Sequence, residues 1–349
     1  MTRPLRVAAI GLGWVAEHRH LPVMRRSRRF EVVGVIDRTE GRARAMAARK
    51  GYARHACAGS LAEVDWLDEV DAVTIATAPM AHFDLAGEAL ARGKHVLTEK
   101  PFTMATAEGR ALVEAAATAD RTLAIVHNFQ FARSTRRLLA DLASGALGEI
   151  RGVDAIQLGN PSRRLPTWID ELPFGLFYDE SPHLLYLLRA VAGPLSLARS
   201  LVVPAKDEAT PARVEAWFRA AEIDCPVRLA CNFESSVSEW YLMVSGTKRL
   251  GIVDIFRDIY IALPNDGRHD TAKVLRTSLT ATWQHWLQHA TSGLPHLTGR
   301  LVYGNDELFD RFARAVDGEA GVLDPIGPEA AQAVLALQHD IVSRAEAVY

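Results

Sequence analysis

The sequence predicts two domains: an α/β domain built on a doubly wound parallel sheet, followed by an α+β domain with a largely antiparallel sheet. Three observations predict this arrangement. The chain has 349 residues, which is long enough for two buried cores. Apolar runs alternate with helical patterns up to Asn128. Beyond Asn128, strand-like runs follow one another with little helix between them.

The first part of the chain contains short runs that are almost entirely apolar. They are Arg6–Ile10, Val32–Ile36, Ala72–Ala76, His95–Leu97 and Leu123–Val126. Helical patterns lie between them, near Val15–Arg25, Glu40–Arg49, His82–Arg92 and Ala107–Ala119. Strands without polar alternation are buried on both faces, which is typical of a parallel sheet covered by helices. We therefore expect residues 1–128 to form one domain.

The second part, residues 129–349, changes to consecutive strands. After a helix around Ser134–Ser144, the strand-like runs are Ile150–Leu158, Leu197–Val203, Val214–Ala220, Val227–Phe233, Trp240–Ser245, Leu250–Phe256 and Tyr260–Leu263. In Trp240–Val244 both alternating faces are apolar, whereas helices of a compact α+β domain cover only one face of a sheet. We expect the other face to meet a second copy in a homodimer or homotetramer. Pro328–Tyr349 has apolar residues at helical spacing and is expected to be a packing helix.

The composition excludes several classes of protein. Lys and Arg total 40 against 42 Asp and Glu, so neither nucleic acid nor a membrane surface is an expected partner. The three cysteines form no Cys-x-x-Cys pair, and the chain has no leader-like start and no apolar run of about 18 residues. We therefore expect a reduced, cytoplasmic protein. We expect no metal site, because His285 and His289 stand four residues apart without a carboxylate motif nearby.

A glycine-rich turn follows the first strand directly and opens a helix. It reads Gly11-Leu12-Gly13-Trp14-Val15-Ala16, in which the two glycines permit a tight turn and let the backbone approach a pyrophosphate. Asp37 ends the second strand, 21 residues after Ala16, where a carboxylate binds the ribose hydroxyls of adenosine. This combination predicts an NAD(P) site with NAD favoured over NADP. Arg38 leaves that preference open, because an arginine there can bind a 2′-phosphate.

Motifs along the chain resemble those of the glucose–fructose oxidoreductase / inositol dehydrogenase / MocA family. They are Ala9–Gly13 with His20-Leu21-Pro22, Val35-Ile36-Asp37, Ala76–Pro79 with His82, Gly93–Val96, Glu99-Lys100-Pro101, and Asp179 with His183. The resemblance implies a Rossmann-type first domain and an open-faced, largely antiparallel sheet in the second. It also implies dimers or tetramers, and a cis peptide bond between Lys100 and Pro101.

The resemblance also implies roles for single residues. Lys100 bridges the nicotinamide ribose and the substrate oxygen, His183 accepts a proton, and Asp179 orients substrate or base. Chemistry agrees, because removing hydride from a carbinol carbon requires loss of the hydroxyl proton, which an imidazole with a pKa of about 6.5 can accept. Lys100 is the second candidate for the proton acceptor.

The complete set of expected site residues is larger. Expected cofactor-binding residues are Gly11, Leu12, Gly13, Trp14, Val15, Asp37, Arg38, Ala76, Thr77, His82, Glu99, Lys100 and Asn128. Expected substrate-binding residues are Lys100, Asn128, Trp168, Tyr178, Asp179 and His183. For Trp168 and Tyr178, packing in the core is an equal alternative to stacking on a sugar ring.

Two positions depart from the family pattern. Ser181 stands where the family usually has glycine, and Tyr186 where it often has an aspartate three residues after the histidine. Ser181-Pro182 resembles an N-cap followed by a first helical residue, which predicts a helix that begins only at Pro182. Asp179 would then lie on the approach to that helix.

Together these features predict an NAD(P)-dependent oxidoreductase that interconverts a secondary alcohol and a ketone on a sugar, aminosugar or cyclitol. Two alternatives stay open. One is an NAD-dependent enzyme of the glycosidase type, which oxidises a sugar transiently to cleave a glycosidic bond. The other is a catalytically silent sensor or scaffold that keeps the nucleotide fold.

Overall fold

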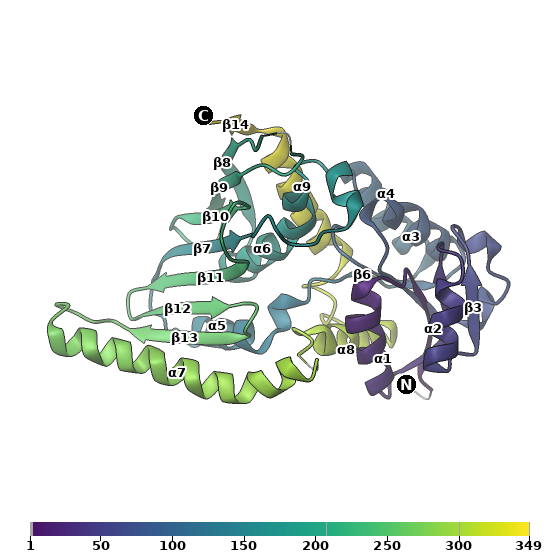
Figure 1. The fold of residues 1–349 in the computed structure, drawn as a ribbon, viewed down its shortest axis with the longest axis horizontal. Coiled ribbons are helices and arrows are strands. Elements are labelled where there is room, and N and C mark those ends of the chain that lie inside the picture. Colours follow the sequence, from purple (N-terminus) through teal and green to yellow (C-terminus); the bar gives the residue numbers. More distant parts are fainter. Residues whose placement is uncertain (1–2, 207, 300, 349) are drawn as a thin grey trace. The chain divides into compact units, whose positions relative to one another are not determined.

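The chain folds into two compact units. The computed structural model describes residues 3–206, 208–299 and 301–348 (Figure 1). The first unit contains Met1–Asn128 and Asn305–Ala336, and the second contains Phe129–Gly304 and Leu337–Tyr349. The chain thus passes from the first unit to the second at Asn128. Asn305–Ala336, which lies within the range expected for the second domain, packs with the first unit instead.

The first unit is built on a six-stranded, fully parallel sheet with the order β3-β2-β1-β4-β5-β6. Its strands are β1 (Leu5–Ile10), β2 (Phe30–Asp37), β3 (Arg54–Cys57), β4 (Ala72–Ile75), β5 (His95–Thr98) and β6 (Leu123–Ile125). Its helices in the first part of the chain are α1 (Leu21–Arg26), α2 (Arg42–Lys50), α3 (His82–Ala91) and α4 (Thr106–Ala119). The doubly wound α/β prediction is confirmed. The sequence did not indicate β3, because three of its four residues are exposed and no apolar run marks it.

The helix after the first glycine turn is not a regular α-helix. A π-helical turn, Ala16–His20, precedes α1, and the backbone N–H of Leu21 donates to Ala16 O, five residues back. This turn places the His20 side chain in the core, where it is fully buried. The wider turn lies directly before Pro22, which has no N–H to donate.

Helix α8 (Asn305–Val316) explains why the later segment joins the first unit. Its fully buried Phe309 contacts the rings of His20 and Phe30, with centroid distances of 5.1 and 5.8 Å. The next residue of the helix, Asp310, accepts a hydrogen bond from Arg29 at 2.6 Å. These apolar and polar contacts attach α8 to α1 and β2.

The second unit is built on an eight-stranded sheet with the order β13-β12-β11-β7-β10-β9-β8-β14. Its strands are β7 (Ile150–Leu158), β8 (Leu195–Val203), β9 (Arg213–Ala220), β10 (Val227–Asn232), β11 (Glu239–Gly246), β12 (Arg249–Asp254), β13 (Ile259–Pro264) and β14 (Ala345–Ala347). Among the described strands of this second sheet, only the pairs β7–β10 and β8–β14 are parallel, so the largely antiparallel prediction is confirmed.

Helices α5 (Arg133–Ala143) and α6 (Leu176–Ala192) pack against the sheet of the second unit. On the opposite face, Ile156, Trp217, Tyr241 and Met243 are only half-buried, which agrees with the expected open face. Helix α7 (Thr271–Leu297) runs along the edge strand β13 (Figure 1). The expected terminal helix is present as α9 (Pro328–Ser343), but the chain then continues into β14 beside β8. Within the described residues, no helix combines the length and the apolar composition needed to cross a bilayer.

Candidate active site

The glycine turn after β1 is closed on one side and open on the other. Gly11 has a φ of +79°, and a Cβ there would lie 2.7 Å from Ala76 O and from the Thr77 side chain. No other residue type fits this position without displacing the backbone after β4. A Cβ on Gly13 would meet nothing within 4 Å. The space beside Gly13 therefore permits a close approach of a ligand to the backbone.

Asp37 connects the end of β2 to the glycine turn. Its carboxylate accepts hydrogen bonds from the backbone N–H groups of Leu12 and Thr39, both at 2.8 Å, and the Arg42 guanidinium lies 3.4 Å away. The carboxylate is almost fully buried, whereas Arg38 beside it is exposed. Each carboxylate oxygen has a second lone pair, so Asp37 retains capacity to accept from ribose hydroxyls.

Thr77 and His82 lie just beyond β4. The Thr77 Oγ1 atom is buried and has no hydrogen-bond partner among the described residues. The His82 ring is fully buried, with Nδ1 2.8 Å from Pro101 O and Nε2 3.3 Å from Thr77 O. His82 thus connects the segment after β4 to the segment after β5. Its surroundings identify it as a support for these segments, and any cofactor role it has acts through them.

The environment of His82 predicts a pH dependence of stability. Burial is the largest influence and lowers the pKa of His82, although the carbonyls of Pro101 and Thr77 and the charge of Glu99 act in the opposite direction. In the unfolded chain the pKa is about 6.5. Below that pH the unfolded state binds a proton that the folded state does not, so the free energy of unfolding falls as the pH falls. Above that pH neither state binds the proton, and this contribution to stability is fully present.

We expect the free energy of unfolding in urea to decrease between about pH 7.5 and 5.5, by at most about 1.4 kcal/mol per pH unit for one proton. Burial and the charge of Arg121 lower the pKa of His95 to about 4, so His95 contributes in the same direction. His82→Gln and the matched variant His95→Gln should each weaken the dependence. Equal slopes in wild type and His82→Gln would show that His82 is not kept neutral by the fold.

Glu99 and Lys100 follow β5 at the same edge of the sheet. Glu99 Oε1 lies 3.0 Å from His20 Nε2, and its Oε2 accepts from the Lys100 backbone N–H at 3.2 Å. Burial alone raises the pKa of Glu99, but the hydrogen bond and charge of His20, together with the charge of Lys100, outweigh it and leave the pKa lowered. Glu99 therefore stays an anion beside the Lys100 ammonium. The Lys100–Pro101 peptide bond is cis, as the resemblance implied.

These groups collect where a parallel sheet of this order binds ligands. The strand order reverses between β1 and β4, and the glycine turn, Asp37, Thr77 and Glu99–Lys100 all follow the carboxyl ends of strands. Asn128, buried at 6% exposure, follows β6. The open space at Gly13 and the unpartnered Thr77 hydroxyl fit a dinucleotide phosphate, and Asp37 fits a ribose. Trp14 is 60% exposed beside this turn, and Val15 follows it.

In the second unit, the expected acid/base pair lies on one face of α6. The prediction that this helix begins only at Pro182 is wrong, because α6 begins at Leu176. Thr210 accepts the N–H of Leu176 at 2.9 Å, a cap from 34 residues away that the local sequence does not reveal. Asp179 and His183 are therefore one helical turn apart and share a face.

Pro182 lies inside α6 and has no N–H to donate to Tyr178 O. The Gln338 side chain supplies the missing donor, with its Nε2 2.5 Å from Tyr178 O and 3.0 Å from Ser181 Oγ. Ser181 is thus a hydrogen-bonding partner within the helix and not its N-cap. The helix continues through the proline because a glutamine from α9 satisfies the carbonyl that the proline leaves without a donor.

His183 is held by a hydroxyl and by aromatic rings. Its Nδ1 lies 2.9 Å from Tyr186 Oη, which also accepts the backbone N–H of Phe129 at 2.9 Å. The rings of Phe129 and Trp240 lie 4.9 and 5.6 Å from the His183 ring, which is 8% exposed. In the sequence, Tyr186 stands out only as a departure from the family pattern. Its position three residues after His183 on a helix was the available signal.

Two expected substrate-binding aromatic residues differ in their surroundings. Tyr178 is fully buried, and its hydroxyl lies 2.9 Å from His339 Nε2, so the packing alternative describes its position. Trp168 lies in a 3-10 turn, Thr167–Glu171, on the connection from β7 to α6 and is partly exposed. Trp168 therefore stays a candidate for substrate contact.

An ion pair with a buried carboxylate, which the sequence did not indicate, lies one residue after Asp179. Glu180 is 6% exposed and accepts from Arg163 at 2.8 Å and from the Gln157 side chain. Arg163 belongs to the same connection as Trp168, so Glu180 attaches this connection to α6. No local pattern marks Glu180, because its partners come from β7 and the loop after it.

His285 and His289 have rings 4.6 Å apart on α7, and no group of three or more metal-ligating side chains occurs among the described residues.

Comparison with known proteins places these observations in context. Residues 5–127 match the model of an oxidoreductase family with an NAD-binding Rossmann fold. The chain is 34% identical over 154 residues to dTDP-3,4-didehydro-2,6-dideoxy-alpha-D-glucose 3-reductase of Actinomadura kijaniata, covering 44% of this chain and 45% of that protein. It is 32% identical over 155 residues to D-glucoside 3-dehydrogenase of Escherichia coli (strain K12), covering 42% and 41%.

The matched parts of these and similar curated relatives span from 34% to 59% of the relatives' own lengths. Among solved structures, the chain is similar to the WlbA dehydrogenase from Bordetella pertussis, which was determined in complex with NADH and UDP-GlcNAcA. The TM-score is 0.76 at 18% identity, with 98% of this chain and 96% of that chain covered. At this identity the similarity shows that the two share a fold.

Proposed function

We propose that this chain, whose residues 5–127 match the model of an oxidoreductase family with an NAD-binding Rossmann fold, interconverts a secondary alcohol and a ketone on a sugar or aminosugar. The observation that carries this proposal is the orientation of the His183 imidazole. His183 lies one helical turn after Asp179, and its Nδ1 is 2.9 Å from the Tyr186 hydroxyl. An oriented imidazole with one nitrogen fixed is suited to move a substrate proton through the other nitrogen.

The proposed reaction assigns a role to residues of each unit. A nicotinamide dinucleotide held by the glycine turn and Asp37 would supply the hydride-transfer chemistry. We propose that Lys100 stabilises the developing alkoxide as a cation, while His183 Nε2 takes the hydroxyl proton and Asp179 orients the substrate or the base. Tyr186 Oη has two acceptor sites, so it can accept from Phe129 N–H and from His183 Nδ1–H together. This tautomer leaves Nε2 as the basic nitrogen.

The named relatives support a proposal for the substrate class. Both the 3-reductase and the 3-dehydrogenase are named for chemistry at position 3 of a glucose ring. We therefore propose position 3 of a hexose, carried as a glycoside or a nucleotide sugar, as the reacting carbon. Asn128 and Trp168 are proposed substrate contacts, and cyclitols remain the second class to test.

A substrate screen tests the function directly. Glucosides, UDP- and dTDP-hexoses, aminosugars and cyclitols are offered with NAD and NADP, and with their reduced forms for keto-sugars, while absorbance of the reduced nicotinamide is followed. We expect turnover with a hexose derivative. Release of an aglycone without net nicotinamide reduction would favour the glycosidase-type alternative. Cofactor binding with no turnover of any substrate would favour a sensor.

We expect NADH to bind more tightly than NADPH. The buried Asp37 carboxylate, held by two backbone N–H groups, accepts from a ribose 2′-hydroxyl and repels a 2′-phosphate. Fluorescence titration of the wild type and Arg38→Ala with both reduced cofactors measures this preference. Tighter binding of NADPH, lost in Arg38→Ala, would assign the selective role to Arg38.

Tyr186→Phe should lower turnover by about 10-fold without changing NADH affinity, because His183 loses the acceptor that fixes its tautomer. The acidic limb of the kcat/KM profile should also move to lower pH, since a buried imidazolium without that partner is less stable. Tyr178→Phe is the matched comparison, because it removes a buried hydroxyl from the same helix that contacts His339 instead. Coinciding pH profiles for wild type and Tyr186→Phe would refute a link between Tyr186 and the proton acceptor.

We also propose that the open face of the second unit's sheet contacts a second copy of the chain. Its half-buried Ile156, Tyr241 and Met243 form an apolar surface, and a polar surface would be expected for a sheet in contact with water. Met243→Glu introduces a charge on this face. Its effect on the mass of the protein in solution is measured together with the variants described below.

A further inference from the structure

Helix α7 has the reverse of the usual polarity of a surface helix. The side turned toward its own chain is polar, and the only buried residues that α7 contributes are Gln288 and Ser292. Gln288 accepts from the Tyr260 N–H at 2.8 Å and donates to Tyr260 O at 2.5 Å. Gln284 makes the same pair of bonds with Ala262, at 2.8 and 3.0 Å.

This glutamine pair closes the outer edge of the sheet. Residues four apart on a helix and two apart on a strand advance by nearly the same distance, about 6 to 7 Å. Gln284 and Gln288 therefore match the free backbone groups of Ala262 and Tyr260 on β13. The edge that would otherwise pair with another strand is covered by side chains. The polar side of α7 thus has a complete structural explanation.

The outward side of α7 is apolar and exposed. We define the α7 stripe as Leu275, Leu279, Trp283, Trp286, Ala290, Leu294 and Leu297, which recur at spacings of 4, 4, 3, 4, 4 and 3 residues. Exposure is 69% for Trp283, 71% for Trp286 and 85% for Leu297. This spacing keeps the residues on one face of a nearly straight helix. A globular protein in water buries such a stripe.

Charge on α7 distinguishes between possible occupants of the stripe. The 27 residues of the helix include no Asp or Glu, and only Lys273 and Arg276 carry a positive charge. A helix that lies in a membrane surface has Lys and Arg along its polar face, whereas the polar face of α7 carries glutamines bonded to its own sheet. An acidic protein partner would find cations only near Thr271, at one end of the stripe. Neither occupant therefore fits the whole stripe.

We propose that the α7 stripe pairs with the α7 stripe of a second copy, antiparallel about a two-fold axis at Trp286. The sequence of the stripe is self-complementary in this orientation. Leu275 meets Leu297, Leu279 meets Leu294, and the large Trp283 meets the small Ala290. Such large-to-small matching across helices gives close packing.

The antiparallel orientation also suits the two positive charges of α7, and the exposed apolar area of the stripe is large. Lys273 and Arg276, near the start of one helix, lie against the end of the other, where the helix dipole favours cations. The stripe exposes on the order of 1,000 Å² of apolar surface, given the roughly 150–250 Å² of an aromatic side chain. A stable interface needs about 800 Å² per partner. The exposed area of the stripe is therefore large enough to form the centre of a specific interface.

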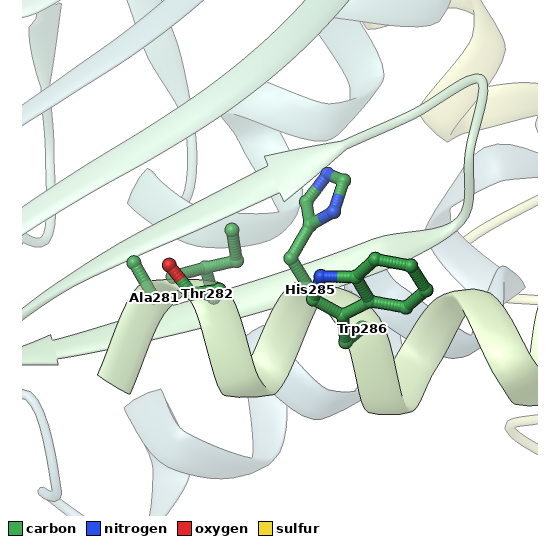
Figure 2. A pocket seen from close by; sticks show the side chains of 5 residues that line it. Ala281, Thr282, His285 and Trp286 are labelled. Carbon is green, nitrogen blue, oxygen red and sulfur yellow. The ribbon is translucent and has the colours of Figure 1, made fainter. Parts of the chain in front are cut away.

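A hollow beside the stripe adds shape to the contact. Figure 2 shows Ala281, Thr282, His285 and Trp286 on α7, which with Ile261 of β13 line a hollow of about 300 Å³. Trp286 belongs to both the hollow and the stripe. The hollow gives the second copy a recess for an apolar side chain next to the proposed axis. It lies within the second unit and uses no residue of the candidate active site.

Light scattering after size-exclusion chromatography tests this pairing. Trp286→Glu places two like charges at the axis and should halve the mass of the wild-type assembly. Ser278→Glu, an exposed position on α7 outside the stripe, should leave the mass unchanged. Met243→Glu reports separately on the open sheet face. A wild-type monomer, or a mass that Trp286→Glu leaves unchanged, would overturn the proposal. If that monomer binds phosphatidylcholine–phosphatidylserine vesicles, a membrane surface is the occupant of the stripe instead.

Cross-linking keeps the test decisive if Trp286→Glu does not fold. In a Cys57→Ser background, which removes the exposed native cysteine, Trp286→Cys should form a disulfide-linked dimer under mild oxidation because the two copies meet at the axis. Ser278→Cys should stay uncross-linked. Equal cross-linking at both positions, or none at Trp286→Cys, would overturn the antiparallel pairing. Neither experiment reads the proposed reaction, so failure here leaves the oxidoreductase proposal unaffected.

Discussion

Lys100→Ala is expected to lower turnover by about 100-fold or more while NADH affinity changes by no more than a few-fold. Lys100 follows the carboxyl end of β5 in the first sheet, and the neighbouring Glu99 carboxylate stays anionic because its pKa is lowered. A fixed cation there stabilises an alkoxide that develops only in the transition state. Its loss therefore affects kcat more than it affects binding of the ground state.

Lys100→Arg separates the two possible roles of this residue. Arginine keeps the positive charge but does not lose its proton at accessible pH. If Lys100 acts as a fixed cation and His183 moves the proton, Lys100→Arg should retain more activity than Lys100→Ala. If Lys100 is itself the proton acceptor, both variants should be equally inactive. Wild-type turnover in Lys100→Ala would remove Lys100 from the site.

Gly13→Val should abolish NADH binding and leave the fold intact. A Cβ on Gly13 meets no protein atom within 4 Å, so the new side chain enters only the space that the proposed pyrophosphate needs. Tryptophan fluorescence titration with NADH measures the binding, and circular dichroism during thermal unfolding measures the fold. An unchanged titration would show that the dinucleotide does not lie against this turn.

Gly11→Ala is the matched control for that experiment. At Gly11 the added Cβ would lie 2.7 Å from Ala76 O, and the φ of +79° strains any residue with a side chain. We therefore expect Gly11→Ala to lower both the melting temperature and NADH affinity, whereas Gly13→Val lowers only the affinity. Comparison of the two variants would thus distinguish a glycine that supports the turn from one that contacts the ligand.

Most of the fold could be predicted because burial leaves a clear pattern in the sequence. β4 is fully buried, and its apolar run predicted it almost to the residue. β7 was predicted with the bounds that the structure has, Ile150–Leu158. β3 and β14 were not predicted, since each is short and largely exposed. The segment Asn305–Ala336 joins the first unit through contacts such as Phe309 with His20, which no local periodicity reveals.

The candidate site was predictable where chemistry follows chain order. Gly11, Gly13 and Asp37 were expected to lie together because a turn after one strand and an acid at the end of the next have fixed spacing, and the Asp37 carboxylate does accept from the Leu12 N–H of the turn. The start of α6 was misjudged because its cap, Thr210, and the donor that compensates for Pro182, Gln338, are both distant in sequence. Tyr186 was similarly underrated: replacing an expected acid by a hydroxyl gave no indication that it fixes His183.

A crystal structure of the protein with NAD tests the central claim most directly. The measurement is the position of Lys100 Nζ and His183 Nε2 relative to C4 of the nicotinamide ring. The proposed reaction predicts that both nitrogens converge on one point over the same ring face, each within about 3.5 Å of a substrate oxygen placed there. Two nitrogens on opposite faces of the ring, or a His183 turned away from the cofactor, would contradict it.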